Sequence, residues 1–283
     1  MSPRPAARCL VDLSAQARLR GGAPAGPPRL RILACPPSGA AAGYWRFLVR
    51  ADVHVLGVQY PGRESRFREP AAPSLGALAA EAAASVAAAP WAASDVPLVV
   101  LGHSMGAAVA AELVSALEHE HGVPVALLAL SAKAAPATAE RPGTSPASDD
   151  DARLRAALDP DAPGADEALV RWLRGIGGTP EAVLANPELL ALLLPVLRAD
   201  LRLSMSHDRL PAPVRSPLLL LRGAEDATVD AAAMDGWRAL TAGPVEHREY
   251  PGGHHPLAAA RDRLLDDLAA CARPAGPRRA GPR

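Results

Sequence analysis

One serine lies in a setting that could make it a nucleophile. Residues 102–106 read Gly-His-Ser-Met-Gly, the apolar run 97–101 precedes them, and a helix-forming stretch, 107–117, follows. The two glycines allow a sharp turn between strand and helix, which would expose the Ser104 hydroxyl where a helix N-terminus stabilises negative charge. A capping serine in an ordinary small-residue turn is the alternative. The strand before the turn and the helix after it favour the nucleophile.

A serine hydroxyl reacts only when a base takes its proton, and a carboxylate must orient that base. In a strand–turn–helix setting of this kind the acid, and then the histidine, follow the serine along the chain. The predicted strand 218–222 is followed by Asp226, which we predict to be the acid. Glu225 is a competitor whose longer side chain would need a different position. Asp226 could instead cap the next helix, near Val229, but Asp230 is the better capping candidate.

Two adjacent histidines follow the predicted strand 245–250. His254 comes directly after two glycines that allow a close approach of the backbone, and we predict it to be the base. His255 is the alternative, although it precedes a proline, which disfavours helical backbone at that position. Four other histidines are less well placed for this chemistry: His54, His103, His119 and His121.

A tetrahedral intermediate needs two backbone N–H groups that stabilise its oxyanion. We expect one from Met105, the residue after the nucleophile. The other should come from the loop 36–43, after the predicted strand 29–35. Because the two prolines that open this loop have no N–H, the donor must be Ser38 or a later residue. An ordinary Gly/Ala turn is the alternative interpretation of this loop.

Composition limits the class of protein. The chain has 283 residues, 49% of them apolar, enough for one large α/β domain or two small ones. Its formal net charge of zero gives no support to a nucleic-acid partner. No stretch reaches the length of a membrane span, and the N-terminus has no apolar signal core. We therefore expect a cytoplasmic protein without membrane association, and a monomer.

The cysteines indicate neither a disulfide framework nor a metal site. Cys9, Cys35 and Cys271 are odd in number and far apart, and they have no metal-ligand spacing. Cys35 ends an apolar strand pattern and is best interpreted as a small buried hydrophobe. We therefore expect no metal and no cofactor.

Short apolar runs alternate with helical patterns along most of the chain. The predicted strands are 29–35, 53–59, 98–102, 125–131, 218–222 and 245–250, and the predicted helices are 43–50, 74–89, 105–120, 229–240 and 256–271. This alternation predicts an α/β domain over 29–273, with a mostly parallel sheet and helices on both faces. Residues 1–28 show no clear periodicity and suggest a flexible arm, and the Pro/Gly/Arg-rich residues 274–283 suggest a disordered tail.

The alternation stops over residues 132–207. Helical patterns cover 149–158, 166–173 and 187–206, the last interrupted by Pro195. We interpret the region as an inserted helical lid, because it separates Ser104 from its predicted partners along the chain. A helical subdomain that only adds stability is the alternative. The tip, residues 142–151, has the Pro/Ser/Gly composition of a mobile segment.

Beyond the serine turn, three stretches make the chain similar to the stand-alone type II thioesterases of polyketide and nonribosomal peptide synthesis. Residues 59–70 resemble the family's segment after the second long strand. Residues 251–254, Pro-Gly-Gly-His, resemble its histidine loop. Three segments resemble its lid: 177–180, 187–189 and 194–200. The resemblance spans residues 29–272.

This resemblance implies an α/β-hydrolase fold with Ser104, Asp226 and His254 as the catalytic triad. It also implies that Ser38 and Met105 occupy the oxyanion-hole positions. The implied activity is hydrolysis of acyl thioesters on the phosphopantetheine arm of acyl or peptidyl carrier proteins, which clears stalled or wrong acyl groups. A general carboxylesterase or lipase with the same triad is one alternative. A carrier-binding accessory protein with weak catalysis is another.

Overall fold

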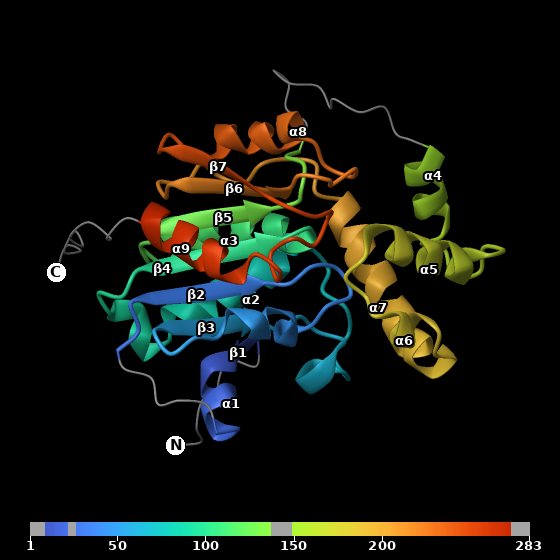
Figure 1. The fold of residues 1–283 in the computed structure, drawn as a ribbon, viewed down its shortest axis with the longest axis horizontal. Coiled ribbons are helices and arrows are strands. Elements are labelled where there is room, and N and C mark those ends of the chain that lie inside the picture. The colour runs from blue at the N-terminus through green and yellow to red at the C-terminus, as the bar shows by residue number, and fades with distance from the viewer. Residues whose placement is uncertain (1–8, 22–26, 137–148, 273–283) are drawn as a thin grey trace.

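A seven-stranded sheet forms the centre of the molecule (Figure 1). The computed structural model describes residues 9–21, 27–136 and 149–272. The strands are β1 (Leu10–Asp12), β2 (Leu30–Cys35), β3 (Val53–Val58), β4 (Leu98–His103), β5 (Leu127–Ser131), β6 (Leu218–Gly223) and β7 (Val245–Tyr250), in the order β1-β3-β2-β4-β5-β6-β7. From β3 to β7 every neighbouring pair is parallel, and β1 joins β3 in the antiparallel direction. The expected mostly parallel sheet is confirmed.

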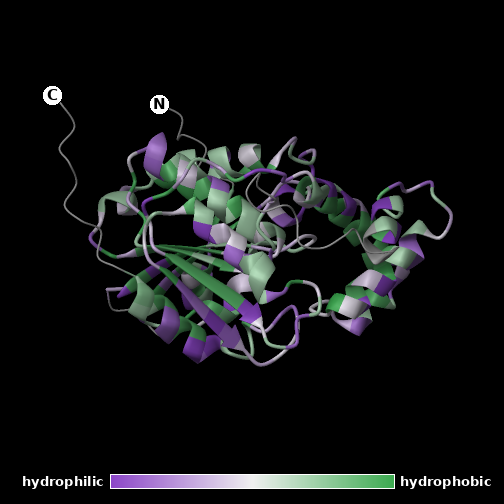
Figure 2. Ribbon diagram, turned by 90° about the horizontal axis from the view of Figure 1, so that it is seen from above, coloured by the Kyte–Doolittle hydropathy of each residue, from purple (hydrophilic) through white to green (hydrophobic). Residues whose placement is uncertain are grey.

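The central strands are largely apolar because both faces of the sheet are covered. Every residue of β2, β4 and β5 is buried. One face packs against α2 (Leu75–Ala87), α3 (Met105–His119), α8 (Ala231–Asp235) and the 3₁₀ helix Gly236–Leu240. The other face packs against α1 (Leu13–Leu19), the 3₁₀ helix Ala42–Leu48 and α9 (Arg261–Cys271). Figure 2 shows hydrophobic residues along the central strands and hydrophilic residues on the outer parts of several helices.

The described residues between β5 and β6 form four helices, which we call the insertion helices: α4 (Asp149–Ala156), α5 (Ala165–Ile176), α6 (Glu181–Leu184) and α7 (Pro187–Met205). They stand beside one end of the sheet (Figure 1). Their apolar side chains form a cluster separate from the two sheet-face cores. The predicted interruption at Pro195 is wrong, because α7 continues through that residue. Residues 142–148 of the predicted tip 142–151 lie outside the described residues. The remaining three residues form the start of α4, which begins at Asp149.

The expectation of a flexible arm over residues 1–28 is wrong for residues 10–19. β1 pairs with Leu56–Val58 at the edge of the sheet, and α1 follows directly. The Asp12 side chain caps α1 by accepting a 2.7 Å hydrogen bond from the N–H of Ala15, and it also lies 3.0 Å from the His54 ring. Leu13 is buried against the sheet. Residues 1–8, 22–26 and the predicted tail 274–283 lie outside the described residues.

Two further 3₁₀ helices cover Glu64–Arg66 and Pro90–Ala93. Cys35 is completely buried and free, as its strand position predicted. Within the described part of the chain, every helix is too short or too polar to cross a lipid bilayer.

Candidate active site

Ser104 lies at the junction of β4 and α3 in a strained backbone conformation. Its φ of 54° and ψ of −125° are unusual for a residue with a side chain. The turn is held by a 2.8 Å hydrogen bond from the Ser104 N–H to the carbonyl oxygen of Ser131 on β5. A strained serine between a buried strand and a helix is the geometry in which hydrolases present a nucleophile.

The two glycines of the serine turn are required by close packing. A Cβ at Gly102 would lie 2.1 Å from the carbonyl oxygen of Gly106. A Cβ at Gly106 would lie 2.1 Å from the carbonyl oxygen of Cys35, at the end of β2. Either contact is far shorter than van der Waals distance, so a side chain would push α3 away from the strands. The start of α3, including Met105, therefore lies directly beside the loop that follows β2.

Asp226 and His254 come together although 27 residues separate them in the chain. Oδ2 of Asp226 lies 3.0 Å from Nδ1 of His254, and both residues are buried. Oδ1 of Asp226 accepts two hydrogen bonds from Thr228, from its hydroxyl at 2.6 Å and from its N–H at 2.8 Å. Burial alone would raise the pKa of Asp226, but the hydrogen bonds with His254 and Thr228 outweigh it and lower the pKa to about 2. The carboxylate is thus ionised at neutral pH and can orient the imidazole.

The competing residues have other positions. Glu225 is exposed, and its backbone N–H donates a hydrogen bond to the carbonyl oxygen of Gly252. Asp230 caps α8, as expected, by accepting a 2.6 Å hydrogen bond from the N–H of Ala233. Thr228 was missed by the sequence reasoning. The spacing Asp-x-Thr, in which an aspartate side chain accepts from the N–H two residues on, is a turn signal that could have indicated it.

A cavity of about 210 Å³ is lined by three of the five predicted site residues, and Asp226 and Met105 are not among its lining residues. We call the sheet with the helices on its two faces the sheet domain. Its contribution to the cavity lining includes Ser38, Ser104, His254 and His255. The insertion helices and their connections contribute mainly apolar side chains: Trp172, Leu173, Ile176, Val183, Leu193 and Leu197. In the part of the chain that the structure describes, the side chains of Ser104 and His254 line the same cavity but are not hydrogen-bonded to each other. Such contacts often tighten only when substrate binds.

Neither of the two backbone N–H groups expected to bind an oxyanion donates a hydrogen bond within the described part of the chain. The N–H of Met105 opens α3 and has no acceptor within that helix. The N–H of Ser38 makes no hydrogen bond to any other described residue. Ser38 lines the same cavity as Ser104, and an oxyanion hole requires N–H donors without another acceptor.

A second group of rings lies beside the serine. Nε2 of His103 lies 3.1 Å from Nδ1 of His255, which is also 3.1 Å from the hydroxyl of Tyr44. Burial lowers the pKa of His255 to about 4 and that of His103 well below its ordinary value, so both rings are neutral at pH 7. Nitrogen atoms of His103, His254 and His255 lie within 4.8 Å of one another, a grouping that could hold a metal ion. Tetrahedral zinc needs nitrogens about 3.3 Å apart, so the rings would have to move to bind it.

The fold and the site define the class of protein. A mostly parallel sheet, a strained serine turn after β4, and acid and histidine loops after β6 and β7 are the architecture of the α/β-hydrolases. Residues 30–271 match the family model described as Thioesterase domain. The chain therefore belongs to the thioesterase domain family and is a hydrolase that acts on thioesters.

Known proteins are similar over most of the chain. Thioesterase PikA5 of Streptomyces venezuelae is 34% identical over 238 residues, which are 83% of this chain and 78% of PikA5. Some other curated relatives are much longer, and the match spans 10% to 15% of their length. The structure of the type II thioesterase BorB from the borrelidin biosynthetic cluster is 28% identical, with a TM-score of 0.71 over 94% of this chain and 98% of BorB. The structure of YbtT, a type II thioesterase from the yersiniabactin NRPS/PKS biosynthetic pathway, is 26% identical, with a TM-score of 0.70 over 92% and 96% of the two chains.

Proposed function

We propose that this chain hydrolyses acyl thioesters carried on the phosphopantetheine arm of carrier proteins, and that it removes stalled or aberrant acyl groups from a polyketide or nonribosomal peptide pathway. One observation carries the catalytic part of the proposal. Ser104, in its strained backbone conformation, lines the same cavity as His254, and Nδ1 of His254 contacts Asp226. The carrier-bound substrate is supported by the relatives, which include type II thioesterases of biosynthetic clusters.

The proposed mechanism proceeds through an acyl-enzyme. The Ser104 hydroxyl attacks the thioester carbonyl carbon while His254 takes its proton, and Asp226 stabilises the resulting imidazolium. The N–H groups of Ser38 and Met105 donate to the oxyanion of the tetrahedral intermediate. The intermediate collapses, the C–S bond breaks, and His254 gives its proton to the leaving thiolate. Water, deprotonated by His254, then attacks the acyl-serine ester and releases the acid and the free Ser104 hydroxyl.

The side chains that line the cavity support the proposal that the cavity binds the acyl group of the substrate. The side chains contributed by the insertion helices are almost entirely apolar, so they favour an alkyl or acyl chain over a charged one. The volume, about 210 Å³, suits a small to medium chain. A pocket of this kind binds through non-directional apolar contact, which permits several acyl groups.

The test is hydrolysis by the purified protein of an acyl-phosphopantetheinyl carrier protein, compared with a p-nitrophenyl ester of the same acyl group. We expect a higher kcat/KM for the carrier-bound thioester. A higher kcat/KM for the free ester would favour a general carboxylesterase, and carrier binding without turnover would favour an accessory protein. In both assays Ser104→Ala should fold normally and lose about 10³-fold or more of kcat. A serine-directed phosphonate should label the unmodified protein at Ser104 and leave the variant unlabelled.

A further inference from the structure

The loop that supplies Ser38 is held by side chains along its whole length. We call residues 36–42 the β2 loop. Four side chains bind its backbone at distances of 2.8–3.2 Å: Tyr60 at the Pro36 carbonyl, Asp200 at the Gly39 N–H, Arg63 at the Ala40 carbonyl and Gln59 at the Ala42 N–H. Between these anchors, the N–H of Ser38 has no acceptor among the residues that the structure describes. The position of that donor therefore depends on the side chains that hold the loop.

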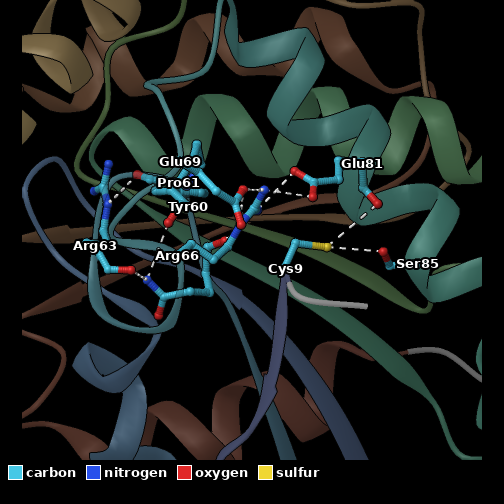
Figure 3. A network of polar contacts seen from close by, with 9 residues as sticks. Cys9, Tyr60, Pro61, Arg63, Arg66, Glu69, Glu81 and Ser85 are labelled. Atoms are coloured by element: carbon cyan, nitrogen blue, oxygen red, sulfur yellow. Dashed lines mark hydrogen bonds and ion pairs between the residues drawn. The ribbon is translucent and has the colours of Figure 1, made fainter. Parts of the chain in front are cut away.

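Three of the four anchors come from one segment, residues 59–63, which is fixed to the sheet domain. Arg66 donates to the Gln59 carbonyl at 3.0 Å and is paired with Glu69 and with Glu81 on α2. Figure 3 shows this network, with Arg66 and its carboxylate partners Glu69 and Glu81. The segment is thus a rigid support on one side of the β2 loop.

The fourth anchor, Asp200, belongs to insertion helix α7. Its carboxylate accepts from both terminal nitrogens of Arg63, at 2.6 and 2.7 Å, and the oxygen nearer Nη1 also accepts from the Gly39 N–H at 2.8 Å. The side chains of Arg63 and Asp200 are 10% and 4% exposed. A buried, bidentate pair of this kind is strong and geometrically specific, and leaving either partner alone is costly.

Helix α7 also packs on the β2 loop. Gly39 has a φ of +75°, and a Cβ there would lie 3.3 Å from methyl groups of Leu193 and Leu197 on α7. The helix therefore covers Gly39 with apolar side chains while Asp200 binds its N–H. If α7 moved away from the sheet domain, Gly39 would lose its acceptor and Arg63 its counter-ion at the same time.

We propose that Asp200 is a positioning residue that couples the insertion helices to the oxyanion hole. With α7 against the sheet domain, Asp200 and Arg63 fix the peptide next to Ser38, and the Ser38 N–H points where the oxyanion forms. With α7 displaced, the β2 loop relaxes and the oxyanion hole is incomplete. Opening for a bulky substrate then switches off transition-state stabilisation, and closing restores it. The inference rests on the proposed function in taking Ser104 as the nucleophile and Ser38 as an oxyanion donor.

The test uses reactions that need the oxyanion hole but no carrier protein: hydrolysis of a p-nitrophenyl ester and the rate of phosphonate labelling at Ser104. We expect Asp200→Ala to lower both kcat and the labelling rate about 10²-fold, with KM changing less than threefold, because one oxyanion donor is misplaced. Asp200→Asn keeps an oxygen acceptor for Gly39 and should recover at least tenfold of that loss. The acidic limb of the pH–rate profile should not move, since His254 is untouched.

Two further variants separate positioning from general stability. The double variant Arg63→Met with Asp200→Leu replaces the buried pair by apolar side chains, which proteins often tolerate, and it should fold yet show the full loss. Asp166→Asn breaks a different ion pair of α7, between Arg198 and Asp166, that does not touch the β2 loop, and it should retain kcat within threefold. A folded double variant with near-normal kcat, or an equal loss in Asp166→Asn, would overturn the proposal. Failure of the protein to act on carrier-bound thioesters would overturn the proposed function alone.

Discussion

The hydroxyl of Thr228 donates a 2.6 Å hydrogen bond to Oδ1 of Asp226, the carboxylate whose other oxygen contacts His254. The Thr228 N–H donates to the same oxygen at 2.8 Å, so Asp226 is fixed on one side by Thr228 and on the other by the imidazole. The Thr228 hydroxyl also lies 2.9 Å from Nδ1 of His254. Thr228 therefore orients the acid and, through it, the base.

Replacing Thr228 by valine should remove the hydroxyl donor while nearly preserving shape. Because Asp226 would be less firmly oriented, we expect kcat to fall about 3- to 10-fold, with a small change in KM. Thr228→Ser, which keeps the hydroxyl, is the matched control and should stay within twofold of the unmodified protein. Steady-state kinetics with a p-nitrophenyl ester provide the measurement. If valine and serine variants behave alike, the hydroxyl has no part in orienting Asp226.

The two adjacent histidines should separate sharply when replaced one at a time. His254→Ala removes the group bonded to Asp226 and should lose about as much kcat as Ser104→Ala, on the order of 10³-fold or more. His255 lines the cavity and contacts His103 and Tyr44 but not Asp226, so His255→Ala should change kcat by about tenfold at most. Both variants are assayed on the same ester and by phosphonate labelling. The reverse ranking would transfer the role of base to His255.

The insertion approaches the histidine loop at Gly178. A Cβ at Gly178 would lie 2.6 Å from the His255 ring, and φ at this position is +83°. Gly178→Ala should therefore displace the connection between α5 and α6 from the cavity, and we expect about a tenfold loss of kcat/KM. Gly177→Ala is the matched control, because Gly177 has a similar φ of +74° but nothing within 4 Å of its Cβ position. Equal losses in the two variants would trace the effect to backbone strain and not to contact with His255.

Stability at acidic pH should depend on His255. Burial lowers its pKa to about 4, so between pH 6.5 and 4 the unfolded chain binds a proton that the folded protein does not. The free energy of unfolding should therefore fall as the pH is lowered through this window. The variant His255→Phe lacks this titrating group. Between about pH 7 and about pH 4 its free energy of unfolding should therefore fall less than that of the unmodified protein, by on the order of 2 kcal/mol. Urea unfolding at about pH 7 and about pH 4 measures the difference. An identical pH dependence in the two proteins would show that the ring is not kept neutral by the fold.

Local sequence patterns determined much of this protein. The largely apolar runs of β2, β4 and β5 predicted strands covered on both faces, and the glycines around Ser104 predicted the sharp turn. Asp226 and His254 were predictable for the same reason: in a parallel sheet the segments after successive strands meet at one edge. Each of these inferences uses residues that are close in the chain, or the regular geometry of the sheet.

Contacts between distant segments were decided by tertiary structure alone. Asp200 meets Gly39 across 161 positions of the chain, because helix α7 packs on the β2 loop. Residues 10–19 lack a strong pattern of their own and became ordered because the edge of β3 offered unpaired backbone groups. The sequence shows which side chains can do chemistry. Only the packing of non-local segments decides which buried charges pair with each other. A buried charge without a partner destabilises the protein, and its partner is brought close only when the whole chain has folded.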